Sequence, residues 1–300
     1  MKKVIYLLAS AAVVFMAAAC NKAASVEDDT VEASFNVNLE QLATKAEFSD
    51  GTSATQLQVL VYTDGEYLPN VSKLSETINI TATVNLKLVK GKTYDIVFWA
   101  QNAAGPYTVA PAAATMTVAP TGNANDENRD AFYRLYNTGK VTGPIEKTIE
   151  LKRPFAQINV FTTEADYNAA KDSKVNFSES GMKLQAPTVL HLLTGVADTP
   201  KDYVFNHAVI NVDEATRLAG YKYVAMNYVL ANAAAELTAV NFSVWTDSPA
   251  VLLNEDLNVT SVPYRRNYKT NIMGNIFTVD GKFNVEIKPA YETPDYQKEF

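Results

Sequence analysis

Residues 31–40 alternate strictly between apolar and polar side chains, and this two-residue period constrains the fold more than any other feature of the chain. The alternating apolar residues are Val31, Ala33, Phe35, Val37 and Leu39. Successive side chains of a β-strand point to opposite faces of a sheet. The pattern therefore predicts a half-buried strand whose five apolar side chains point inward.

Short apolar segments of the same kind follow along the rest of the chain. Turn sequences such as Asp64-Gly65, Lys90-Gly91 and Asp280-Gly281 separate them. The expected strands cover residues 56–63, 77–89, 93–100, 114–118, 148–151, 156–162, 181–185, 203–205, 221–230, 237–245, 271–279 and 282–287. Helical periodicity is scarce, and only residues 164–171 and 213–219 could form short helices or turns.

Many short strands with regular turns predict an all-β protein. About 280 residues follow the leader peptide described below, and a domain commonly has about 100 to 150 residues, so we expect two domains. We place the N-terminal β-sandwich at residues 31–147 and the C-terminal one at residues 148–300. Both are expected to be Greek-key, transthyretin-like sandwiches arranged in tandem.

The N-terminus has the composition of a bacterial lipoprotein signal peptide. Lys2 and Lys3 supply positive charge, residues 4–19 are apolar or small, and three alanines precede Cys20, the only cysteine of the chain. We expect residues 1–19 to be removed and Cys20 to be acylated. Each buried methylene of an acyl chain contributes about 0.8 kcal/mol, so two or three chains would anchor the protein to a membrane. The alternative for Cys20 is a buried free cysteine.

An acidic tether is expected at residues 20–30, which include Glu27-Asp28-Asp29. It is interpreted either as a solvated linker or as a surface-export signal of Bacteroidetes lipoproteins. The formal net charge of the chain is −7, and loss of the two lysines of the leader makes it −9. Such a charge argues against nucleic acid as a partner, although a local basic patch remains compatible with it.

The sequence offers few groups that could carry out catalysis. His191 and His207 do not have the spacing of metal ligands, and no cysteine is left to join them. There is no glycine-rich phosphate loop, no G-x-S-x-G nucleophile elbow and no H-E-x-x-H pair. The sequence therefore predicts a protein that is not an enzyme and that uses neither a metal nor a cofactor.

The aromatic residues allow two interpretations. Exposed rings could form a platform on which glycans stack. Phe98, Trp99, Phe242 and Trp245 nevertheless lie inside strand patterns, where burial of such a side chain contributes about 1.5 to 3 kcal/mol. We therefore expect these four residues in the core.

Three segments, in this order and spacing, carry a resemblance to a known family. They are residues 43–62, with ATKA, Asp50-Gly51 and the strand LQVLVY; residues 151–160, LKRPFAQINV; and residues 262–277, VPYRRNYKTNIMGNIF. The last is similar to an R-N-x-[RK]-T-N-x-x-G pattern. Together with the leader, they resemble the fimbrillin-like lipoproteins of Bacteroidetes, the FimA/Mfa-type fimbrial subunits.

The resemblance implies a lipid-anchored protein of the outer membrane and cell surface that becomes part of a fimbrium. In that family a trypsin-like protease cuts after a basic residue in the loop that follows the first strand. Lys45 is the matching position, Ala46 would become the new N-terminus, and residues 31–45 would be removable. An extended segment of another fimbrial subunit would then occupy the vacated sheet edge.

Several points stay open at this stage. Residues 283–300 are either a donor strand for another subunit or a last strand with a frayed end. The basic pairs Lys152-Arg153 and Arg265-Arg266 resemble processing sites, but we expect them to pair with backbone or carboxylate groups. The competing function is a surface lipoprotein that does not polymerise, either a fimbrial anchor or an adhesin for glycans or host proteins.

Overall fold

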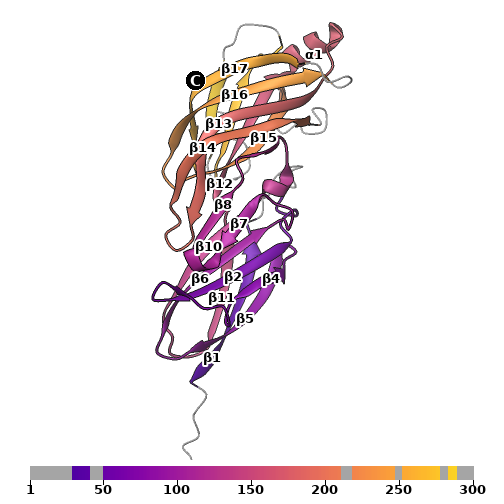
Figure 1. Cartoon of the computed structure of the whole chain (residues 1–300). Coiled ribbons are helices and arrows are strands. Elements are labelled where there is room, and N and C mark those ends of the chain that lie inside the picture. Colours follow the sequence, from indigo (N-terminus) through magenta and orange to yellow (C-terminus); the bar gives the residue numbers. More distant parts are fainter. Residues whose placement is uncertain (1–28, 41–49, 211–217, 247–251, 278–282, 289–300) are drawn as a thin grey trace, which may run out of the picture.

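Figure 1 shows the computed structural model, an elongated molecule in which two β-rich lobes follow each other along the long axis. The structure describes residues 29–40, 50–210, 218–246, 252–277 and 283–288. In the described part of the chain, no helix has the length and apolar character needed to cross a membrane.

The lobe that contains the first strand has two facing sheets. The first sheet has the order β11-β1-β5, and the second has the order β10-β6-β2-β3, with β4 paired to β2. These strands are β1 (Thr30–Leu39), β2 (Gln56–Thr63), β3 (Glu66–Tyr67), β4 (Lys73–Thr77), β5 (Thr81–Val89), β6 (Thr93–Gln101), β10 (Phe132–Lys140) and β11 (Ile145–Leu151). In Figure 1 this lobe carries the indigo and purple segments.

The other lobe also has two sheets. One has the order β15-β12-β18-β19, and the other has the order β17-β16-β13-β14-β9, with β8 paired to β13 and to β7. Their bounds are β7 (Tyr107–Ala110), β8 (Thr115–Val118), β9 (Thr121–Asn123), β12 (Phe155–Thr163), β13 (Phe177–His191), β14 (Ala197–Val209), β15 (Tyr221–Leu230), β16 (Glu236–Thr246), β17 (Leu252–Tyr264), β18 (Lys269–Gly274) and β19 (Phe283–Lys288).

Helices are short in the described chain. The α-helix α1 (Glu164–Asp172) follows β12, and the hydroxyl of Thr163 caps it by accepting a hydrogen bond from the Asp166 N–H. Two 3₁₀ turns, η1 (Pro111–Ala113) and η2 (Glu127–Arg129), lie in the connection between β7 and β10. Residues 213–217 of the second expected helix lie outside the described residues.

Two apolar clusters form the core, and strands β2 and β6 contribute to both. Val59 and Val61 pack with β1 and β5. Leu60 and Tyr62, on the opposite face of β2, pack with the strands of the other lobe, which include β8. A strand that is covered on both faces needs an almost unbroken apolar run, which the sequence of β2 provides. The two lobes therefore share a continuous apolar contact at their junction.

The all-β class expected from the sequence is confirmed. The division into domains at residues 147 and 148 stays a proposal, and two features of strand pairing bear on it. β11 crosses that position and pairs over its whole length with β1. β8 and β9, which precede the proposed boundary, pair with β13 and β14 of the second lobe.

Candidate functional site

The first strand lies in the middle of its sheet. β1 is parallel to β11, where Ala33 is opposite Ile145, and antiparallel to β5, where Ala33 is opposite Leu86. The resemblance in sequence implied that removal of this strand would leave a vacated sheet edge with unpaired backbone groups and an apolar groove. The observed order means that its removal would leave a slot between two strands, each with unpaired backbone groups.

The predicted inward face of this strand is confirmed. Val31, Ala33, Phe35, Val37 and Leu39 are each at most 8% exposed. The ring of Phe35 contacts Phe98 and Tyr136 of the facing sheet edge-on, with centroid distances of 5.4 and 5.7 Å. The slot that holds β1 therefore has an apolar floor built by the opposite sheet, with two aromatic contacts at the position of Phe35.

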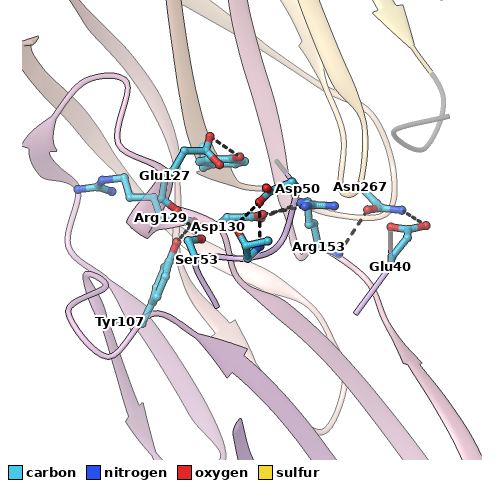
Figure 2. Close-up of polar contacts among 11 residues, drawn as sticks. Glu40, Asp50, Ser53, Tyr107, Glu127, Arg129, Asp130, Arg153 and Asn267 are labelled. Carbon is cyan, nitrogen blue, oxygen red and sulfur yellow. Dashed lines mark hydrogen bonds and ion pairs between the residues drawn. The ribbon is translucent and has the colours of Figure 1, made fainter. Parts of the chain in front are cut away.

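The residue after β1 connects the strand to the junction of the two lobes. The backbone N–H of Glu40 donates to the Leu151 carbonyl at 2.9 Å. The carboxylate of Glu40 lies 3.4 Å from Lys152 Nζ, and its Oε1 accepts a hydrogen bond of 3.2 Å from Asn267 Nδ2. Figure 2 shows Glu40 and Asn267 side by side at this junction.

A buried ion pair lies beside this contact. Arg153 donates to both carboxylate oxygens of Asp130 at 2.7 Å each, and both side chains are completely buried. The guanidinium also lies over the ring of Phe132, 4.4 Å from its centroid. Burial raises the pKa of Asp130, and the charge of Arg153 opposes that shift. This two-point contact fixes the start of β12 against the segment that precedes β10 (Figure 2).

The second basic pair has the structural role expected from the sequence. Arg265 Nε donates to the Ala233 carbonyl at 2.6 Å. Arg266 Nε donates to the Ala231 carbonyl at 3.1 Å, and its Nη2 donates to the Gly195 carbonyl. Both arginines therefore hold backbone groups of neighbouring loops in place. The prediction of backbone or carboxylate pairing is confirmed for these pairs.

Three of the predicted site residues lie outside the described part of the chain: Cys20, Lys45 and Ala46. Their roles remain predictions. The described residues on either side of segment 41–49 are Glu40 and Asp50, and Figure 2 shows both at the junction. At the other end of the chain, residues 283–288 form β19 and pair with β18, as a last strand would. The donor role of residues 283–300 stays a prediction, and residues 289–300 lie outside the described part of the chain.

One aromatic residue lies elsewhere than expected. Phe98, Trp99 and Phe242 are completely buried, as expected, but Trp245 is only half-buried. Its ring stacks on that of His207 with a centroid distance of 4.2 Å and an interplanar angle of 19°. The expectation of a buried Trp245 was wrong because Trp245 shares the outer face of β16 with Asn241 and Ser243, whereas Val240, Phe242 and Val244 form the buried face.

Trp245 and His207 line a groove of about 450 Å³ on the outer face of the sheet that contains β13, β14 and β16. Lys183, Asn241 and Ser243 line the same groove. Gly181 has no side chain, and this leaves space beside Ser243. A Cβ atom at residue 181 would lie only 3.0 Å from Ser243 Oγ. The groove therefore combines aromatic rings with amide, hydroxyl and ammonium groups.

Each histidine is paired with one carboxylate. His191 Nε2 lies 2.8 Å from Asp198, and this hydrogen bond is the main cause of the lowered pKa of Asp198. His207 Nδ1 lies 2.5 Å from Glu179. Among the described residues, no group of three or more His, Cys, Asp or Glu side chains has the arrangement of a metal site.

Comparison with known proteins places the chain in a family. No curated protein matches it in sequence. Solved structures similar to it include a DUF1812 protein of Bacteroides thetaiotaomicron, with 12% identity, a TM-score of 0.48 and coverage of 85% of this chain and 97% of the other.

Two Porphyromonas gingivalis structures are also similar to the chain. The fimbrial anchor protein Mfa2 has 10% identity, a TM-score of 0.46, and coverage of 85% and 97%. The tip fimbrial protein Mfa3 has 15% identity, a TM-score of 0.45, and coverage of 86% and 98%. A family profile matches residues 23–300, nearly the whole chain. The chain therefore belongs to this family, the family of unknown function DUF6562.

Proposed function

We propose that this protein is a subunit of a cell-surface fimbria, made as a lipoprotein acylated on Cys20 and assembled by exchange of its first strand. The observation that supports the proposal most is the central position of β1 between β11 and β5. A strand in that position leaves a slot that only another strand can fill, because both edges of the slot carry backbone donors and acceptors.

The connection of β1 to the rest of the fold makes its removal feasible. A strand held at both ends in the middle of a sheet could not leave. β1 is the first described strand, so one cut within residues 41–49 separates it from every later strand. Lys45 lies in this segment and is the site that we propose for a trypsin-like protease.

The energetics favour exchange over simple loss. Burial of an apolar side chain such as Phe35 or Leu39 contributes about 1.5 to 3 kcal/mol, and the backbone of β1 is hydrogen-bonded on both sides. A cut strand therefore stays in place until a segment with a similar alternation replaces it. We propose that the replacing segment comes from another fimbrial subunit.

Limited trypsin digestion of the purified protein tests this proposal. We expect cleavage after Lys45, a new N-terminus at Ala46, and multimers that form a ladder on native gels. Lys45→Gln should prevent both cleavage and assembly without a change in the fold. Lys90→Gln is the matched control, because Lys90 is an exposed lysine of a turn and its loss should alter neither result.

The N-terminal residue of the protein recovered from cells distinguishes the alternatives. Ala46 supports the processed subunit. A blocked Cys20, together with a cut protein that stays monomeric, contradicts strand exchange and supports a permanently tethered fimbrial anchor or adhesin.

The groove at Trp245 favours one second candidate function, binding of a glycan at the cell surface. Aromatic rings can pack against the apolar face of a sugar ring, while groups such as Asn241, Ser243 and Lys183 can hydrogen-bond its hydroxyls. The groove volume of about 450 Å³ lies within the roughly 300 to 1,000 Å³ usual for ligand sites. An adhesin of this kind does not need the first strand to leave.

Tryptophan fluorescence tests this second candidate, because the chain has only two tryptophans and Trp99 is completely buried. A panel of neutral and acidic oligosaccharides should change the emission of Trp245 if one of them binds. Trp245→Ala should weaken that binding roughly tenfold, measured by isothermal titration calorimetry because this variant lacks the fluorescent reporter. Leu237→Ala, an exposed residue of the same strand, serves as the control. Unchanged affinity in Trp245→Ala contradicts a glycan site in this groove.

A further inference from the structure

The two basic pairs, far apart in the sequence, line the same pocket. It has a volume of about 340 Å³ and is lined by five basic residues, Arg134, Lys152, Arg153, Arg265 and Arg266. None of the described residues that line it is Asp or Glu. The chain as a whole has a net charge of −7, so this pocket has the opposite sign to the protein around it. Such a local field favours an anionic ligand.

Several of these cations are held in fixed positions. Arg153 is bound to Asp130, and Arg266 is bound to the Ala231 and Gly195 carbonyls. Arg265 lies over the ring of Tyr268, 4.6 Å from its centroid. Partial burial lowers the pKa of Arg266, because burial removes water from around its charge. An anion that entered the pocket would meet positive groups that are already ordered.

A carboxylate already occupies the rim of the pocket. Lys152 and Asn267 both line the pocket, and both contact Glu40. The amide of Asn267 is oriented for this contact, because its Oδ1 accepts the backbone N–H of Arg153 at 3.3 Å and leaves Nδ2 to donate to Glu40. Figure 2 shows this chain of contacts from Arg153 through Asn267 to Glu40.

The position of Glu40 connects the pocket to the slot. Glu40 directly follows Leu39, the last buried residue of β1, and lies within the residues that a cut after Lys45 would release. We propose that the pocket binds a carboxylate at this position. It thereby selects a partner strand that has an acidic residue directly after its last buried side chain. This inference rests on the proposed function, because the partner strand enters by exchange.

The contacts of Glu40 also suggest why a partner strand could displace β1. Within the described residues, Oε2 of Glu40 is buried and has no hydrogen-bond partner. A buried acceptor without a partner is unfavourable. A partner whose carboxylate also contacts a further basic residue of the pocket would use both of its oxygens. Replacement of β1 by the partner strand would then be favourable.

Peptide exchange on the full-length protein cut by trypsin provides the test. The probes are synthetic peptides of residues 30–40 with an amidated C-terminus and a fluorophore at the N-terminus, one with Glu40 and one with Glu40→Gln. Anisotropy reports their entry into the slot. We expect the Glu40→Gln peptide to bind about tenfold more weakly or worse, because a charge-assisted contact is lost. In the Lys152→Met protein this preference for Glu over Gln should largely disappear.

The exposed ion pair between Glu32 and Lys87 is a matched control, since it also joins β1 to a neighbouring strand. A Glu32→Gln peptide and the Lys87→Met protein should change affinity less than about twofold. Equal binding of the Glu40 peptide and the Glu40→Gln peptide overturns the carboxylate site and leaves strand exchange intact. Entry of no peptide at all overturns both proposals. Equal competition by inorganic sulfate and by an acidic peptide overturns the selection of a strand in favour of a general anion site.

Discussion

Replacing Phe35 with alanine is expected to lower the free energy of unfolding by about 3 to 5 kcal/mol. The side chain is completely buried, and it packs between Phe98 and Tyr136 of the facing sheet. Its truncation removes these contacts and leaves a cavity that the surrounding strands can fill only in part. Chemical denaturation followed by circular dichroism measures the change.

Glu32→Ala on the same strand is the matched control. Its side chain is exposed and its ion pair with Lys87 has an N–O distance of 3.8 Å, so we expect a change within about 0.5 kcal/mol. In the cut protein, Phe35→Ala should also speed the release of the first strand, whereas Glu32→Ala should not. Similar stability losses in the two variants would contradict the assignment of Phe35 as a buried contact of the slot.

The second large effect is expected at the junction of the lobes. Arg153→Met should lower the free energy of unfolding by about 3 to 5 kcal/mol, because it leaves the buried carboxylate of Asp130 without its partner. Both side chains are completely buried, so water cannot replace the lost contact. Guanidinium denaturation of the full chain measures this loss.

The double variant Arg153→Met/Asp130→Leu distinguishes the effect of an unpaired buried charge on stability from the effect of lost packing around Arg153. Replacing both members of a buried ion pair with apolar residues is often neutral, so the double variant should recover most of the stability. If it is as unstable as the single variant, the packing of Arg153 on Phe132 matters more than its charge. A loss below about 1 kcal/mol in Arg153→Met would show that the pair does not hold the junction.

Several elements could be predicted from the sequence because their signals are local. Residues 56–63 and 221–230 form β2 and β15 with the expected bounds, since each is an apolar run that ends at turn residues. Residues 164–171, expected to form a short helix or a turn, form the helix α1, which extends by one residue. Its cap comes from Thr163, which lies next to the first helical residue.

Other strands are longer than expected or were not expected at all, because tertiary pairing overrides local signals. We expected a strand only at residues 181–185, yet β13 runs from Phe177 to His191. The register shifts around Gly181, as in a β-bulge, and Pro187 pairs opposite Pro200. β17 was not predicted because polar residues and Pro263 interrupt its apolar pattern.

Some features of the candidate site were also predictable from the sequence, and others were not. The burial of Phe35 and the other alternating residues was predictable, because a two-residue period is a property of the strand itself. The charge of the pocket was not predictable, because the pairs Lys152-Arg153 and Arg265-Arg266 converge only after the lobes have folded. Cleavage at Lys45 and acylation of Cys20 are predictions of the sequence that await the experiments above.

The order of amino acids alone was enough to establish that the chain is all-β, that residues 31–39 form a strand and which face of that strand is buried. The folded molecule was needed to learn that this strand lies between β5 and β11, and that Glu40 meets Asn267, 227 residues later in the chain. Side-chain alternation follows from local backbone geometry, whereas the choice of neighbours depends on packing between segments far apart in sequence.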